Sequence, residues 1–351
     1  MGLYLQSGYL NMDHVMANRA VFSFIVGGRG IGKTFGSLKY VIENDIKFIY
    51  MRRTQTQVDM IKSDDLNPFV SLRTVLGADW QFCMKKINKN ITGVYRGAFD
   101  PDSQTYSPAG PVLGYIMALS TVSNIRGFDA SDVRVLIYDE FIPERHERQM
   151  TAEAAAFLNA VETIGRNREL SFQDPLKVIC LSNANDLANP IFIELKLVGV
   201  VEKMLAQGTE FKLFPERRLA VYILHDSQIS QKKADTSLYQ LVGRDSEFAQ
   251  MSISNDFTQE ERALIRSENI KEYKPLVRVG EISIYKHKSQ RRYYITDFHS
   301  GNPERYESGE MDLKRFTRDY YYLWLSYLNR NIVFESYVQQ IIFEKYFNMR
   351  K

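Results

Sequence analysis

The sequence predicts an α/β fold in which helices cover both faces of a mostly parallel sheet. A complete phosphate-binding loop pattern stands between an apolar run of strand length and a proline-free helical stretch. Further apolar runs alternate with helical stretches over the first half of the chain, and several of them end in polar side chains. This order is typical of parallel sheets that bind ligands at the carboxyl ends of their strands.

Composition places the chain among soluble globular proteins, with 44% apolar and 25% charged residues. Its 351 residues are enough for two or three domains. A net charge of +3 is small, so a nucleic-acid partner would have to be held by local basic patches. Cys83 and Cys180 are the only cysteines, which suits a reducing compartment without disulfides or a zinc site. No apolar run or leader predicts a membrane partner or secretion, and we expect an intracellular protein.

The phosphate-binding loop matches G-x-x-x-x-G-K-[ST] in full, and it consists of Gly27, Gly28, Arg29, Gly30, Ile31, Gly32, Lys33 and Thr34. Backbone N–H groups of such a loop surround the phosphates of a nucleotide. We expect Lys33 to reach the β- and γ-phosphates and the Thr34 hydroxyl to bind Mg²⁺. A strand at 21–26 and a helix at 33–43 give the required order, which disfavours a glycine loop without a ligand.

A second strand is predicted at 47–51, and it ends in Arg52 and Arg53. The two arginines either bring positive charge to the ligand-binding edge or form a solvated basic pair. Prolines and glycines are frequent from residue 67 to 114, so we expect loops and short strands there, such as one at 115–119.

The run from Val133 to Tyr138 is typical of a buried parallel strand, and Asp139 and Glu140 follow it. After a phosphate-binding loop, the first carboxylate is expected to orient Mg²⁺ and the second to polarise a water for attack on the γ-phosphate. A strand cap would explain one carboxylate, whereas the pair favours hydrolysis.

A helix is predicted from Ala152 to Ile164, and it leads into Arg166. A buried strand at 176–181 follows and ends in Ser182 and Asn183. Asn183 either senses the γ-phosphate or the attacking water, or forms an Asx turn at the strand end. Two short strands, at 211–214 and 219–224, would complete this domain.

A second domain is predicted after a polar linking segment. Strands are expected at 276–285 and 292–296, and helices at 313–328 and 332–347, whose aromatic stripes favour a core over a stacking platform for bases. We therefore divide the chain into residues 1–223, a linker at 224–258 and a C-terminal domain at 259–351.

Five motifs resemble, in order and spacing, the phi29-type viral DNA packaging ATPases, which are compact relatives of large terminase subunits. The motifs are residues 24–34, 48–53, 138–142, 166–169 and 179–184, and the likeness covers about residues 20–195. The resemblance implies a P-loop NTPase domain of the additional-strand, catalytic-glutamate class. It also implies that Glu140 activates water and that Arg166 is an arginine finger for a neighbouring subunit. The resemblance leaves open whether Arg126 or Arg168 shares the arginine-finger role. Asn183 falls in the segment that, in the family, couples hydrolysis to movement.

The resemblance further implies an ATP- and Mg²⁺-dependent ring motor, typically a homopentamer, that moves double-stranded DNA through a viral portal into a preformed capsid. Such a motor would work in the host cytoplasm at the procapsid, and some relatives also use a structural RNA. The C-terminal domain would be similar to an RNase H-like nuclease that has lost its chemistry. Its opening strand contains one carboxylate, Glu281, and Asp297 after the next strand is a single further candidate. A two-metal nuclease site needs several carboxylates, so we predict no nuclease activity.

Three other functions fit the residues less well. A helicase or remodeller would carry further motifs that are not found, and a small-molecule kinase is disfavoured because Glu140 beside Asp139 favours water as acceptor. A nucleotide-gated portal component with little turnover would not need a complete catalytic set. DNA phosphates could be held by four basic groups, each of which is otherwise a solvated face: Lys85, Lys86 and Lys89; Arg217 and Arg218; Lys232 and Lys233; and Lys286, His287 and Lys288 with Arg291 and Arg292.

Overall fold

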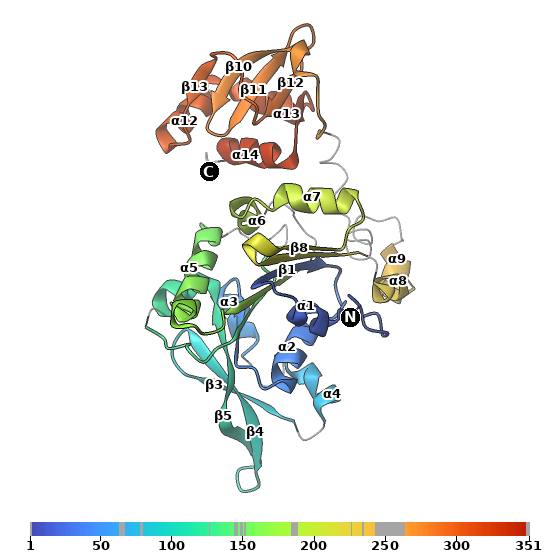
Figure 1. Ribbon diagram of the computed structural model, residues 1–351, viewed down its shortest axis with the longest axis vertical. Coiled ribbons are helices and arrows are strands. Elements are labelled where there is room, and N and C mark those ends of the chain that lie inside the picture. Colours follow the sequence, from blue (N-terminus) through green and yellow to red (C-terminus); the bar gives the residue numbers. More distant parts are fainter. Residues whose placement is uncertain are drawn as a thin grey trace. The chain divides into compact units, whose positions relative to one another are not determined.

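A computed structural model gives the fold of the chain. The structure describes residues 2–62, 67–77, 80–125, 127–143, 147, 150, 152–183, 189–225, 227–233, 235–242 and 264–348. The chain forms two compact units (Figure 1). Unit 1 comprises Met1–Ile191 and Lys203–Phe257, and unit 2 comprises Phe192–Glu202 and Thr258–Lys351.

Unit 1 is built on a nine-stranded sheet in the order β3-β4-β5-β2-β6-β7-β1-β9-β8. Its six central strands run parallel, and antiparallel strands flank them at both edges. The strands are β1 (Phe22–Gly27), β2 (Phe48–Arg52), β3 (Phe82–Lys86), β4 (Ile91–Asp100), β5 (Thr105–Ala118), β6 (Val135–Asp139), β7 (Lys177–Ser182), β8 (Phe211–Phe214) and β9 (Leu219–Leu224). The predicted mostly parallel sheet is confirmed.

Helices lie on both faces of this sheet, as the sequence predicts (Figure 1). Helices α1 (Met12–Ala17) and α2 (Lys33–Glu43) bury apolar side chains in one core with Ile25 of β1. On the other face, Phe157 of α5 (Glu153–Gly165) packs against Phe24, the neighbour of Ile25. Adjacent residues of β1 thus serve opposite cores, because side chains alternate along a strand.

The prediction of loops and short strands between residues 67 and 114 is wrong in part. Strands β4 and β5 form a long hairpin whose outer rungs, from Arg96↔Ala109 to Asp100↔Thr105, extend past the neighbouring strand β2 (Figure 1). Pro108 of β5 lies in this outer part, and Pro111 lies between the outer and inner rungs, so no neighbouring strand needs their missing N–H groups. Helix α3 (Gln55–Met60), the short helix α4 (Arg73–Leu76) and 3₁₀ turns connect the remaining strands of this part.

Unit 2 contains a five-stranded sheet in the order β13-β10-β11-β12-β14. Its strands are β10 (Tyr273–Val279), β11 (Ile282–His287), β12 (Tyr293–Thr296), β13 (Glu304–Tyr306) and β14 (Ile332–Phe334). Helices α12 (Glu310–Asp319), α13 (Tyr321–Leu328) and α14 (Tyr337–Asn348) cover one face, where Phe316, Leu323 and Phe343 are buried. The aromatic stripes therefore belong to a core.

Three predicted boundaries in unit 2 are wrong. The opening strand is two antiparallel strands, because Gly280 takes a positive φ of 50° and turns the chain. The helix predicted at 313–328 is interrupted at Tyr320. The helix predicted at 332–347 begins only at Tyr337, because Ile332–Phe334 pairs with β12 as a short parallel strand.

The segments before β8 and after β9 are described only in part. Helices α6 (Pro190–Glu194) and α7 (Val198–Ala206) precede β8, and α8 (Gln228–Lys233) and α9 (Ser237–Val242) follow β9. The rest of the predicted linker, from residue 243 onward, lies outside the described residues, and the domain boundaries stay a prediction. Within the described part of the chain, no helix has the length and apolar character needed to cross a membrane.

Candidate active site

The phosphate-binding loop joins β1 to α2 at the carboxyl end of the central strands. Gly30 and Gly32 take positive φ values of 75° and 84°, which side chains rarely adopt. Gly27 has no room for a side chain, because an added Cβ would lie 2.5 Å from Ile31 and 2.9 Å from Leu224. The glycines are thus needed for the loop geometry itself.

Lys33 is buried at the start of α2, and its Nζ lies inside the loop. The ammonium donates to the backbone oxygens of Gly27, at 2.7 Å, and Gly28, at 2.8 Å. It also donates to Oδ1 of Asn183, at 3.1 Å. Asn183 follows β7, which pairs with β1, so the sheet brings the predicted γ-phosphate sensor beside the predicted phosphate-binding lysine.

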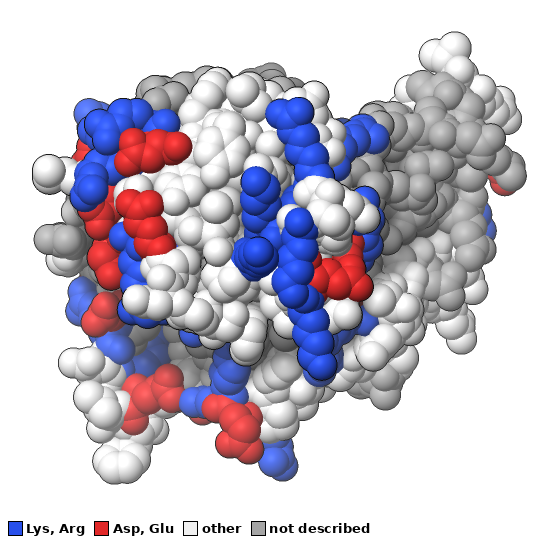
Figure 2. Space-filling model, turned by 90° about the horizontal axis from the view of Figure 1, so that it is seen from above, with Lys and Arg blue, Asp and Glu red and all other residues white. Residues whose placement is uncertain are grey.

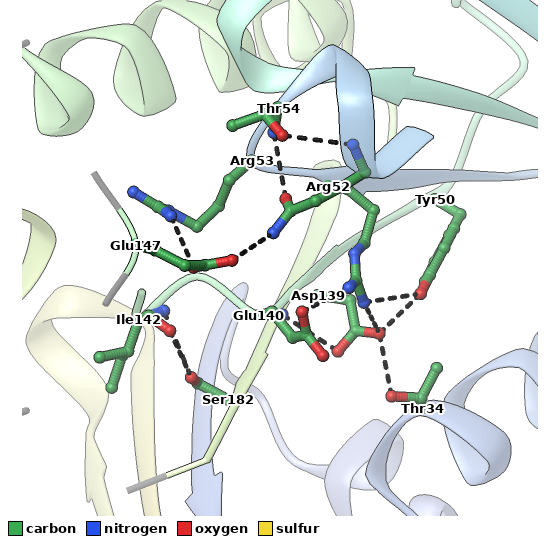
Figure 3. A network of polar contacts seen from close by, with 11 residues as sticks. Thr34, Tyr50, Arg52, Arg53, Thr54, Asp139, Glu140, Ile142, Glu147 and Ser182 are labelled. Atoms are coloured by element: carbon green, nitrogen blue, oxygen red, sulfur yellow. Dashed lines mark hydrogen bonds and ion pairs between the residues drawn. The ribbon is translucent and has the colours of Figure 1, made fainter. Parts of the chain in front are cut away.

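Asp139 is the centre of the polar network at this edge (Figure 3). Its Oδ2 accepts hydrogen bonds from the Thr34 hydroxyl at 2.9 Å and from the Tyr50 phenol at 2.6 Å. Burial raises the pKa of Tyr50 well above its usual value, and the charge of Asp139 raises it further, so the phenol stays protonated and donates. Asp139 is only 3% exposed, and these donors satisfy its buried oxygen.

Arg52 joins the two carboxylates that follow β6. Its guanidinium donates to Asp139 at 3.1 Å and forms a second ion pair with Glu140 (Figure 3). Burial by itself lowers the pKa of Arg52, but the neighbouring phenol and carboxylates raise it above the ordinary value. The guanidinium is therefore permanently charged, and its positive charge balances the negative charge of the Glu140 carboxylate in this state.

Arg53 points to the opposite face of the sheet and has a different role. Its guanidinium forms two hydrogen bonds with the Glu153 carboxylate, at 2.7 and 3.1 Å, and one with Glu147 at 3.1 Å. Arg53 and Glu153 are each 1% exposed, and the Tyr138 phenol also donates to Glu153. This buried network ties the end of β2 to the first turn of α5.

Arg166 is the C-terminal cap of α5 and lies far from the phosphate-binding loop of its own chain. Its guanidinium donates to the backbone oxygen of Phe128 at 2.8 Å and lies 3.5 Å from Asp129, both of which precede β6. Helix α5 begins at the carboxyl edge of the sheet and has 13 residues, so it is about 20 Å long. The structure thus places Arg166 at the amino edge and does not bring it together with Lys33 or Glu140.

Arg168, the second arginine of this motif, is a structural residue in this arrangement. It is 7% exposed and donates to the backbone oxygens of Ala130, Val133, Ile164 and Gly165. Burial lowers its pKa from the usual value, which fits a guanidinium held by carbonyls rather than by a carboxylate. Arg126 lies outside the described residues.

The donor set fits a magnesium nucleotide better than a metal held by protein alone. Thr34 and Asp139 provide a hydroxyl and a carboxylate oxygen within 2.9 Å of each other, and Mg²⁺ takes few such protein ligands beside water and phosphate. Among the described residues, no three His, Cys, Asp or Glu side chains come together as a metal site. A triphosphate would therefore have to supply the missing ligands.

Comparison with known proteins decides which family has this site. The family model of the podovirus DNA encapsidation protein (Gp16) matches residues 5–86 and 102–299. The chain belongs to the podovirus DNA encapsidation protein family. The predicted phi29-type DNA packaging ATPase is thereby confirmed.

Individual relatives agree with this family. A DNA packaging protein of Bacillus phage B103 is 24% identical over 351 aligned residues, which cover 94% of this chain and 98% of that protein. A chain of the bacteriophage Phi-29 viral genome packaging motor assembly has a TM-score of 0.67 at 21% identity, with 99% of this chain and 100% of that chain covered. A chain of the Phi-28 gp11 DNA packaging motor has a TM-score of 0.64 at 18% identity and covers 99% of both. These two structures show that this chain shares their fold.

Sequence reasoning misses Tyr50 of the site and the buried Glu153, and it leaves the roles of Arg52 and Arg53 open. It predicts Tyr50 only as part of a strand and does not distinguish the two arginines. Consecutive side chains of a strand point to opposite faces, so the pattern Tyr50-x-Arg52 puts both polar groups on one face. This spacing is the sequence signal that could have identified Tyr50 and Arg52 as neighbours. The role of Glu153 was not foreseeable from its alanine-rich helix.

Proposed function

We propose that this DNA encapsidation protein is one subunit of an ATP-driven ring, a homopentamer as the resemblance implies, that moves double-stranded DNA through a portal into a preformed capsid. One observation carries the proposal. The phosphate-binding loop and both carboxylates lie at the carboxyl edge of the sheet, whereas Arg166 lies at the amino edge. If Arg166 is the arginine finger, a complete catalytic set needs two copies of the chain.

The position of β7 supports the additional-strand class. It lies between β1, which leads into the phosphate-binding loop, and β6, which ends in Asp139. Thr34 and Asp139 would hold Mg²⁺, which supplies positive charge to the β- and γ-phosphate oxygens when it is bound. Lys33 would exchange the carbonyls of Gly27 and Gly28 for phosphate oxygens, since an ammonium donates equally well to either.

Glu140 would be the general base, and Arg52 would control it. In the present arrangement Arg52 forms an ion pair with Glu140, and this pairing lowers the ability of the Glu140 carboxylate to accept a proton. Glu140 is 44% exposed at its side chain and lies beside Asp139, so water can reach it once Arg52 withdraws. The carboxylate would then take the proton of the attacking water, while the preorganised charges of Lys33 and a neighbour's Arg166 stabilise the transition state.

The dependence on a neighbour gives the test of this proposal. An arginine finger raises turnover by about 10³ to 10⁵ fold, so ATP turnover per chain should rise with protein concentration or on mounting at the capsid. Arg166→Ala subunits should bind ATP normally and fail to activate their neighbours in mixtures with wild-type subunits. Equal turnover by Arg166→Ala and wild type would remove the finger assignment.

The same assay with and without duplex DNA separates a motor from a nucleotide-gated portal component. A motor is expected to hydrolyse ATP faster on DNA and to package it when capsids are supplied. Turnover that stays near the uncatalysed rate in the presence of both would favour the structural component. The family match favours packaging over a helicase role.

We also propose that unit 2 contacts DNA phosphates and has an RNase H-like fold without nuclease chemistry. Lys274 and Lys286 face each other on β10 and β11 and are both exposed, and Lys288 and Arg291 lie exposed at the following turn. Figure 2 shows a part of the surface where Lys and Arg side chains gather with few acidic ones among them. Metal-dependent cutting of DNA by the purified chain would overturn the claim that nuclease chemistry is lost.

A further inference from the structure

The segment that follows Arg166 presents an apolar surface to solvent. Phe172 is fully exposed, at 100%, and Leu170 is 78% exposed. Isolated exposed leucines are common, but a fully exposed phenylalanine two residues from an exposed leucine is typical of an interaction surface.

The backbone at Phe172 takes a conformation that disfavours phenylalanine. Its φ and ψ are 56° and 27°, in the left-handed region that glycine and asparagine occupy most readily. The Phe172 N–H donates to the backbone oxygens of Arg168 and Glu169, which closes the turn. The ring is fully exposed, so burial against the described part of the chain does not compensate for the conformation, and a role outside the isolated chain is indicated.

The turn that carries Phe172 starts at a buried anchor. The guanidinium of Arg168 donates to four backbone oxygens, whereas the pair of Glu169 and Arg218, at 2.7 Å, is half exposed and adds little. A side chain close to such an anchored residue loses less freedom when it is buried against a partner. This preorganisation is expected of an interface anchor.

We infer that Leu170 and Phe172 are anchor residues that dock on the next copy of this chain in the ring. The inference rests on the proposed function, because Arg166 precedes them by only a few residues. If Arg166 enters the site of a neighbour, that neighbour must cover the surface that surrounds it. An apolar turn next to Glu169 is also poorly suited to DNA phosphates, which favours a protein partner.

The nucleotide-binding edge of the sheet also presents exposed apolar side chains. Leu5 and Tyr9 are 46% and 43% exposed, and Tyr9 lies against the phosphate-binding loop, since a Cβ on Gly32 would be 3.0 Å from its ring. Each copy thus carries an apolar projection beside its arginine finger and exposed apolar side chains beside its nucleotide site. Two different surfaces of this kind are what a head-to-tail contact that closes into a ring requires.

The test uses substitutions that act in opposite directions on folding and on assembly. Phe172→Gly and Phe172→Asn both suit the left-handed backbone, so the thermal midpoint of the monomer should stay the same or rise. Assembly of the full-length chain with a non-hydrolysable ATP analogue is followed by sedimentation velocity. The protein concentration at which the Phe172 variants assemble should be at least about tenfold higher than for wild type. Leu241→Ser in α9, where Leu241 is 83% exposed, is the matched control and should assemble as wild type.

Phe172 variants that assemble as wild type would overturn the inference. A photo-reactive benzophenone residue at position 172 identifies the occupant in motors mounted on capsids. A cross-link to a second copy is expected, and a cross-link to a capsid protein or to DNA would contradict the inference. An Arg166→Ala chain that assembles normally with unchanged turnover would remove the finger while leaving the docking surface in place.

Discussion

Glu140 has an unusual backbone for its residue type, with a φ of 56° directly after β6. The Asp139 carboxylate accepts its backbone N–H at 3.1 Å and helps to hold this conformation. Strain of this kind costs about 1 to 3 kcal/mol and is frequent at active sites. The position therefore suits a residue selected for chemistry rather than for folding.

Replacing Glu140 by Gln should leave ATP binding intact and lower turnover by about 10² to 10⁴ fold, because the amide cannot accept a proton. Equilibrium nucleotide binding and single-turnover hydrolysis measure the two effects separately. Glu43→Gln, at an exposed position of α2, is the control and should change neither. Loss of binding in Glu140→Gln would contradict the water-activation role.

The buried pair of Arg53 and Glu153 makes a prediction about stability. Arg53→Met should lower the free energy of unfolding by about 3 to 5 kcal/mol, because it leaves the Glu153 carboxylate buried without its partner. The double variant with Glu153→Leu should recover much of that loss. Urea denaturation measures both.

The exposed pair of Lys39 and Glu43 provides the control for this cycle. Lys39→Met should cost no more than about 0.5 kcal/mol, since exposed pairs on helices contribute little. A similar loss for Lys39→Met and Arg53→Met would show that burial does not decide the effect.

At the scale of elements, the outer rungs of the β4–β5 hairpin contribute little to the core. They are exposed, with Phe99 at 52% and Tyr106 at 46%. Replacing residues 98–107 by a short turn should change the free energy of unfolding of the chain by less than about 1 kcal/mol. Urea denaturation checks this, and a loss of several kcal/mol would show that the hairpin supports the sheet.

The central strands and α2 could be predicted from sequence, because buried parallel strands and an amphipathic helix carry strong local patterns. The long hairpin could not, because its pairing is independent of hydrophobic alternation and its prolines indicate loops. The break of the aromatic helix at Tyr320 has no proline or glycine as a signal. The Tyr320 hydroxyl instead donates to Glu304 of β13 at 2.9 Å, a tertiary contact that the local sequence does not specify.

The candidate site was predictable where a motif names its residues and unpredictable where only the fold brings them together. Lys33, Thr34 and Asp139 meet as expected, and Asn183 joins them. The partners of Arg52 and Arg53 depend on the strand order β2-β6-β7 and on the start of α5, neither of which the sequence specifies. The distance between Arg166 and its own phosphate-binding loop likewise becomes known only from the direction of α5.

For the whole molecule, DNA binding through phosphates predicts a steep dependence on salt. Substituting Lys274 and Lys286 together by Ala should weaken binding to all duplex sequences alike and reduce the slope of log K against log salt by about 2. Fluorescence anisotropy at several salt concentrations measures this. Unchanged slopes would exclude this pair from the DNA contact, and Lys39→Ala serves as a control with the same change of charge per residue.

Helix α5 has one end fastened beside the nucleotide edge through Glu153 and the other end at Arg166. A helix fixed at both ends passes a displacement of one end on to the other. If nucleotide binding or release shifts the end of β2, the position of Arg166 would therefore change as well. The nucleotide state of one subunit would then affect the active site of the neighbour that receives Arg166.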